Sequence, residues 1–156
     1  MYSQLSLLKK SVFKQFENEM PKAGYEIGSG DGQLELLTVF PTDIDYRTFH
    51  WPSVSVEIDD RLPVVQLDLG TGKSTSYSVS CQLFARNNLE REFLAEKIST
   101  AFENKRVPVY DFNVDGTSIL TYFEPLDVTA HTIRLVSEEG LELFRNTIEF
   151  TAKITE

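Results

Sequence analysis

The first clear pattern in the chain is an amphipathic helix near the N-terminus. Between residues 4 and 20 the apolar side chains recur at steps of three and four, whereas Lys9, Lys10 and Lys14 fall largely on the other side. Pro21 and Gly24 follow this pattern, and both residue types favour the end of a helix. The spacing therefore predicts a helix that stops near Met20. Its apolar positions are Leu5, Leu8, Val12, Phe13, Phe16 and Met20.

The next segment, from Tyr25 to Trp51, has a weaker pattern. It begins with a glycine-rich turn around residues 28–32 and contains one apolar patch, from Leu34 to Phe40, before Pro41. We interpret it as a long excursion that holds one strand. A connection of this size in a compact domain is often functional.

A run of strands follows. Apolar and polar residues alternate over 53–58 and again over 65–69, which predicts two half-buried strands with Asp59 and Asp60 in the turn between them. The strongest alternation runs from Tyr77 to Ala85 and is long enough to cross a sheet.

A second helix is predicted after this strand. Asn87 can cap it, with Glu90 three residues on, and an apolar stripe then extends to the helix end near Asn104. The stripe comprises Leu89, Phe93, Leu94, Ile98, Ala101 and Phe102. Four further segments read as strands: 107–112, 118–123, 126–135 and 147–154.

These elements predict an α+β fold with a mostly antiparallel sheet flanked by two main helices. The connections between strands are mainly too short for parallel crossovers. No repeat, linker or change of composition separates a second part, so residues 1–156 are interpreted as a single domain.

Composition adds a constraint on partners. The 24 acidic and 15 basic residues give a formal charge of −9, which repels nucleic-acid phosphates. Such a surface serves solubility, or lets DNA slide past without sticking. Apolar runs fall far short of the roughly 20 residues that cross a bilayer, and the N-terminal pattern lacks a signal-peptide core. We therefore expect a soluble intracellular protein.

The sequence contains strings that partly resemble catalytic or metal-binding motifs, but each lacks residues that the motif requires. The string from Gly70 to Ser74 suggests a phosphate-binding loop, but Leu67 stands where that motif needs glycine, and a strand follows, so a hairpin turn is favoured. His50 and His131 have no paired ligand spacing, and no aspartate cluster matches a calcium loop.

Nucleophilic chemistry is not indicated either. The serines at 76, 78 and 80 lie on the polar face of a regular strand, and Cys81 lies on the apolar face as a small buried hydrophobe. We expect no catalytic, cofactor-binding or metal-binding residue, and no enzyme activity.

Four aromatic residues near the end of the excursion and at a later strand are candidate interface positions: Phe49, Trp51, Tyr110 and Phe112. Large aromatics near loops are enriched in interfaces as well as in cores. Core burial is the favoured interpretation for each, and an exposed one would indicate a partner subunit.

The order of the segments carries a resemblance. An N-terminal helix and an excursion precede Leu62–Val65, the strand Tyr77–Ala85, a helix from Asn88, the segment Val109–Phe112 and a closing strand from Ile148 to Ile154. Over about residues 50–156 this order is similar to that of the tail terminator, or tail completion, proteins of long-tailed bacteriophages.

The resemblance implies a virion structural protein of the tail or neck, assembled in the host cytoplasm. Such subunits form a hexameric ring that caps the tail tube, stops its polymerisation and joins it to the head-closure protein, while DNA passes through. It implies no catalytic residue and no cofactor. The alternatives are another neck, connector or tail-tube subunit, or a small-molecule-binding or enzymatic α+β domain, which a deep pocket with converging polar groups would reveal.

Overall fold

The N-terminal helix forms where the apolar spacing predicts it. The computed structural model describes residues 3–37, 52–59, 64–68, 72–136 and 142–155, and α1 runs over Gln4–Glu19. The Ser3 hydroxyl caps it by accepting a hydrogen bond from the Ser6 amide at 3.2 Å. A short 3₁₀ turn, η1 (Pro21–Ala23), follows the helix, and Gly24 adopts a left-handed φ of 93°. The predicted helix and its end are confirmed.

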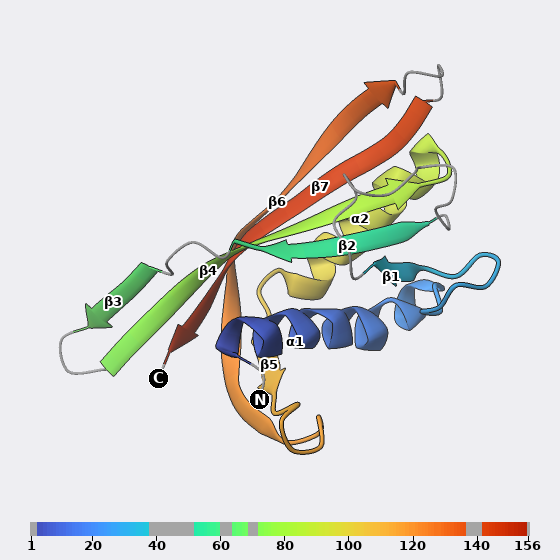
Figure 1. The fold of residues 1–156 in the computed structure, drawn as a ribbon. Helices are drawn as coiled ribbons and strands as arrows, with labels where there is room; N and C mark the ends of the chain where they lie inside the picture. Colours follow the sequence, from blue (N-terminus) through green and yellow to red (C-terminus); the bar gives the residue numbers. More distant parts are fainter. Residues whose placement is uncertain (1–2, 38–51, 60–63, 69–71, 137–141, 156) are drawn as a thin grey trace.

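The remaining elements alternate between strands and one further helix (Figure 1). They are β1 (Glu35–Leu37), β2 (Ser53–Ile58), β3 (Val64–Asp68), β4 (Gly72–Ala85), α2 (Asn88–Phe102), β5 (Val107–Tyr110), β6 (Ile119–Val136) and β7 (Glu142–Thr155).

The strands form one sheet in the order β1-β2-β4-β7-β6-β5, and β3 also pairs with β4. The α+β class is therefore confirmed. The sheet is mixed, which corrects the expectation of a mostly antiparallel one: β1 runs parallel to β2, and the other described pairs are antiparallel. Parallel neighbours need a long connection, and residues 38–52 provide it.

β2 and β3 do not form the hairpin that a turn at Asp59 suggested. Both pair with β4, one after the other along the same edge: Ile58 lies opposite Val79, and Val64 lies opposite Ser76. The hairpin is formed by β3 and β4 instead, with Asp68 opposite Gly72. This pairing agrees with a hairpin, and not a phosphate loop, at the glycine-rich string.

β6 is one long strand where the sequence indicated two. The predicted break falls at Pro125, which lacks a ladder donor, but β5 pairs with β6 only as far as Phe123. Beyond that residue no other described strand pairs with β6 on this side, and proline is tolerated at such an edge. A bulge between Leu126 and Thr129, with Asp127 at φ 55°, absorbs the irregularity.

Both helices pack on the same face of the sheet and against each other, so they do not flank it from two sides. The Gln15 amide nitrogen donates to the Ala101 carbonyl at 2.8 Å, and the rings of Phe16 and Phe102 meet edge to face at 5.5 Å. Phe102 then stacks on Phe150 of β7 at 4.8 Å. The helices and the apolar face of the sheet thus share one core.

The second helix is present, but it buries a different side from the one that the sequence pattern predicts. Leu89 and Phe93 were expected in the core, yet their side chains are 78% and 41% exposed. The charged residues Glu90 and Arg91 are buried in their place. The buried side chains of α2 are at residues 90–91, 94–95, 98 and 101–102. Their spacing is that of a helix, but the stripe they form does not include Leu89 and Phe93.

Candidate assembly surfaces

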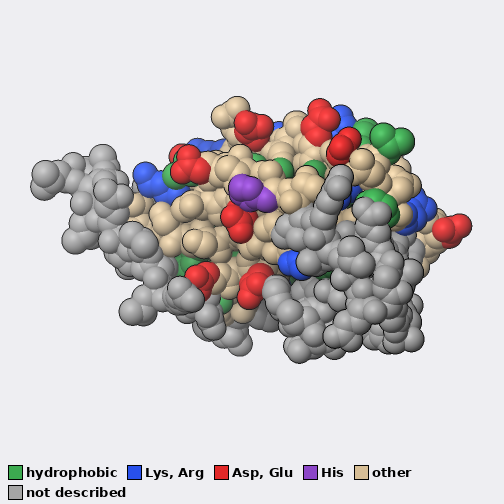
Figure 2. All heavy atoms as spheres, turned by 90° about the horizontal axis from the view of Figure 1, so that it is seen from above, with side chains coloured by type: hydrophobic (Ala, Val, Ile, Leu, Met, Phe, Trp, Pro, Cys, Tyr) green, Lys and Arg blue, Asp and Glu red, His purple; other side chains and the backbone are tan. Residues whose placement is uncertain are grey.

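The face of the sheet that points away from the helices is polar and is open at one end. Because successive strand residues point to opposite faces, the neighbours of the core residues Val79 and Phe150 lie on this outer face. Aligned in register across β4 and β7 are Ser78 with Thr151 and Ser80 with Glu149. Figure 2 looks onto the molecule from above Figure 1, and acidic side chains are spread over the surface it shows.

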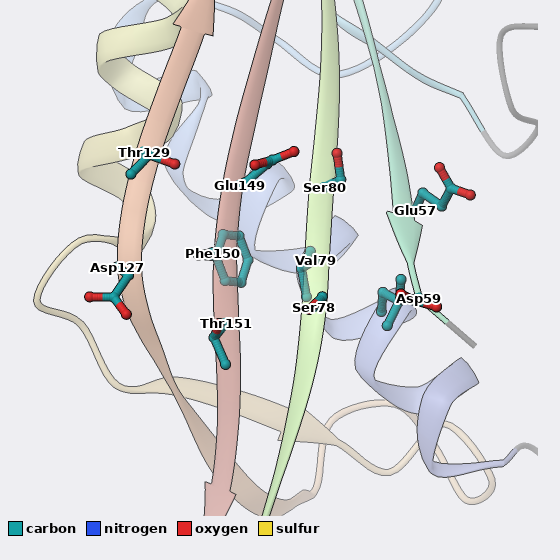
Figure 3. A pocket seen from close by; sticks show the side chains of 11 residues that line it. Glu57, Asp59, Ser78, Val79, Ser80, Asp127, Thr129, Glu149, Phe150 and Thr151 are labelled. Atoms are coloured by element: carbon teal, nitrogen blue, oxygen red, sulfur yellow. The ribbon is translucent and has the colours of Figure 1, made fainter. Parts of the chain in front are cut away.

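A shallow hollow of about 860 Å³ lies on this face. Its carboxylates come from three strands and the residue after one of them: Glu57 and Asp59 at β2, Glu149 on β7 and Asp127 at the bulge of β6. Figure 3 shows them in front of the strands, with the helices behind. Asp127 lies at the bulge, at the margin of the hollow, and its carboxylate points away from the other lining residues (Figure 3).

Three of these carboxylates have no positively charged partner among the described residues. Within the described part of the chain, the exposed side chains of Glu57, Asp127 and Glu149 make no hydrogen bond or ion pair. Among the described residues, no group of three or more histidine, cysteine, aspartate or glutamate side chains is placed to hold a metal ion. The hollow therefore presents a local negative potential to whatever lies against it.

The other end of the same face has a different character. Phe84 is fully buried there, with the Arg145 guanidinium 5.5 Å from its ring centroid. Arg145 donates two hydrogen bonds, at 3.0 and 2.6 Å, to the side-chain oxygen of Gln82, which also accepts from the Thr147 hydroxyl at 2.8 Å. This polar cluster was not singled out from the sequence. Its signal was the interruption of the serine pattern of β4 by Gln82 and Phe84.

The outward side of α2 forms a second surface. Phe93 stacks loosely with Tyr25, with centroids 6.2 Å apart, and the Lys97 ammonium lies 5.4 Å from the Phe93 ring centroid. Leu89 is one turn away and exposed. Exposed apolar side chains beside a cation are typical of a protein-contact surface.

An ion pair holds the start of this helix. The Asn87 side chain accepts from the Glu90 amide at 2.9 Å, as the capping pattern predicts. The Glu90 carboxylate accepts from the Arg86 guanidinium at 2.5 Å and from the Tyr25 hydroxyl at 3.0 Å. Burial raises the pKa of Glu90, but the bonds from Arg86 and Tyr25 outweigh it, so the pKa lies below its ordinary value.

Two of the four predicted interface aromatics can be placed. Phe49 and Trp51 lie outside the described residues, whereas Tyr110 and Phe112 are half-buried and meet edge to face at 6.3 Å. The Lys14 ammonium lies 4.0 Å from the Tyr110 ring centroid and donates to the Gly116 carbonyl at 2.6 Å. Phe112 also lines a hollow of about 890 Å³ beside α1.

Cys81 is buried, as predicted. Its position in the core raises the pKa of the thiol to about 12. A thiol with so high a pKa has almost no thiolate near neutral pH, and the thiolate is the nucleophilic form. The side chain therefore acts as a small core residue.

None of the helices in the described residues is long and apolar enough to cross a membrane. No protein-family model matches the sequence, and no curated protein matches it.

Proposed function

We propose that this chain is a tail terminator subunit of a long-tailed bacteriophage, which forms a hexameric ring on the end of the tail tube and joins it to the head-closure protein. The observation that carries the proposal is the pair of open surfaces on opposite sides of one α+β layer. Such a subunit can contact a copy on each side, as a ring requires.

The order of elements supports the proposal. The segment Tyr77–Ala85 lies within the long strand β4, the helix from Asn88 is α2, and Ile148–Ile154 lies within β7. These are the parts that the resemblance rests on. The β3–β4 hairpin and the paired strands β6 and β7 project toward opposite ends of the molecule (Figure 1), where they could contact neighbouring proteins.

The character of the surfaces supports a structural role over an enzymatic one. The hollow on the sheet is open and lined by carboxylates, serines and threonines, and it has no described histidine or thiol among its lining residues. Nucleophilic catalysis needs a nucleophile and a base within hydrogen-bonding distance. Charge and exposed apolar area instead suit binding to another protein surface.

The charge of the chain suits a ring through which DNA passes. A net charge of −9 disfavours capture of the phosphate backbone, so DNA can move without sequence-specific binding. Under this proposal the lumen wall carries more acidic than basic side chains, and the partners of the ring are the tail tube protein and the head-closure protein.

The first test is the mass of the purified full chain in solution. Sedimentation and native mass spectrometry at increasing protein concentration should reveal hexamers, and negative-stain images should show rings. A chain that stays monomeric at every concentration and ionic strength would contradict the ring. A hexamer located elsewhere in the particle, such as the head side of the neck, would favour the alternative connector role.

A further inference from the structure

The helix side of the molecule carries a basic patch. Lys22, Lys97 and Lys105 surround a small hollow of about 150 Å³ near the ends of α1 and α2, together with Glu19. The ammonium groups of Lys22 and Lys105 both lie 3.3 Å from oxygens of Glu19. Glu19 thus pairs with two of the three ammonium groups, while that of Lys97 lies over the Phe93 ring, so the charged residues that line this hollow have a positive sum.

This basic patch and the acidic hollow lie on opposite sides of the same layer. The patch is on the helices, and α2 is held to the inner face of β7 by the stacking of Phe102 on Phe150. Glu149 and Thr151, the neighbours of Phe150 in the strand, point to the outer face and line the hollow. The helix layer and the sheet therefore lie between two surfaces of opposite charge.

Each surface also has partly exposed apolar side chains. Phe93 is 41% exposed and lies beneath Lys97, while Leu126 is 38% exposed and next to Asp127 in the strand that borders the hollow. Protein interfaces commonly combine an apolar centre with a charged rim. Both surfaces therefore offer apolar side chains, and their charges are opposite.

We propose that the basic helix patch of one copy docks against the acidic sheet hollow of the next copy, head to tail. The proposal rests on the ring proposed above and specifies which surfaces build it. Two different surfaces on opposite sides of a subunit cannot be satisfied in a two-fold dimer. They generate a closed ring when the rotation between copies closes, and an open filament when it does not.

The test uses charge reversal on both surfaces in the full chain. Glu149→Lys and Lys97→Glu should each weaken assembly about tenfold, because each places like charges across the contact. The variant that carries both changes should recover most of the loss, since the pair is restored with its signs exchanged. Sedimentation gives the assembly constants, and thermal melts followed by circular dichroism establish that each variant folds.

A matched control changes the same charge elsewhere. Glu26→Lys alters an exposed residue in the segment after η1, outside both hollows, and raises the net charge by the same amount as Glu149→Lys. Its assembly should equal that of the unaltered chain. High salt should weaken assembly of the unaltered chain, because screening acts on exposed charges.

The possible results distinguish the proposed contact between copies from the formation of the ring. Hexamers that form equally well with Glu149→Lys and with Lys97→Glu would overturn the proposed contact and leave the ring intact. Failure of the doubly changed chain to recover, with both single variants folded, would also overturn it. An unaltered chain that never assembles would overturn both proposals.

Discussion

Phe102 on α2 stacks against Phe150 on β7, with ring centroids 4.8 Å apart and planes at 26°. This contact joins the helix layer to the centre of the sheet, and Phe16 of α1 meets Phe102 from its other side. The three rings hold both helices on one face. The opposite face is open around Ser78, Ser80, Glu149 and Thr151, whereas Phe84 on the same face is buried.

Removing the Phe102 ring should strongly destabilise the fold. Phe102→Ala leaves a cavity in a fully buried site, and such changes cost about 3–5 kcal/mol. Urea unfolding of the purified chain measures the loss. Phe93→Ala is the matched control, since Phe93 is on the same helix but partly exposed, and it should cost less than half as much. An equal loss of unfolding free energy in the two variants would contradict the burial of Phe102 and the partial exposure of Phe93.

The Glu90 carboxylate should stabilise the fold in a pH-dependent way. Its pKa in the folded chain lies below the ordinary value of 4.5, so its stabilisation is present above that value and is lost as pH falls through the lowered pKa. Glu90→Gln should cost about 2 kcal/mol at neutral pH by weakening charge-assisted hydrogen bonds.

The difference between the Glu90→Gln variant and the unaltered chain should shrink as pH falls below about 4. Urea unfolding at a series of pH values follows it. Glu92→Gln, an exposed neighbour on the same helix, serves as the control and should change little at any pH. A loss that stays constant down to pH 2 would point to packing and not to charge as its origin.

The Cys81 thiol should not react while the chain is folded. Its pKa is raised to about 12 by burial, and it has no exposed surface. Alkylation by iodoacetamide at pH 8 should therefore proceed only after addition of denaturant, as intact mass spectrometry would detect. Rapid modification of the folded chain would contradict the burial of this strand.

Phe112 should matter more for partner binding than for folding. Its ring is half-buried and packs against Tyr110. Phe112→Ala is expected to cost about 1–2 kcal/mol in urea unfolding, because part of the ring is already exposed. Its effect on binding of the tail tube or head-closure protein should be larger, since aromatic residues dominate interface energetics.

The comparison for Phe112→Ala is Val114→Ala, which alters a 75% exposed side chain in the same connection. Co-sedimentation of both variants with the tail tube or head-closure protein shows whether Phe112 lies at a contact with either partner. If Phe112→Ala lowers stability and leaves both interactions unchanged, the aromatic pair belongs to the fold alone.

The local elements could be predicted from sequence because each has a local cause. Apolar spacing sets α1, alternation sets β4 and β7, and the Asn87 cap sets the start of α2. These signals lie within a few residues of the structure they determine.

Features that depend on distant partners could not be predicted in this way. Glu90 is buried where the distant Tyr25 and the neighbouring Arg86 both donate to its carboxylate, and Leu89 beside it is exposed. β6 continues past Pro125 because β5 ends before it. The acidic hollow exists because register brings Glu57, Glu149 and Asp127 to one face, and only the pairing of strands fixes that register.

Imaging of particles assembled without this protein tests its role most directly. If the chain caps the tail tube, electron micrographs should show abnormally long tails or heads and tails left unjoined, and supplying the unaltered chain should restore the normal length. Normal virions in its absence, with tails of uniform length and joined heads, would contradict the terminator role.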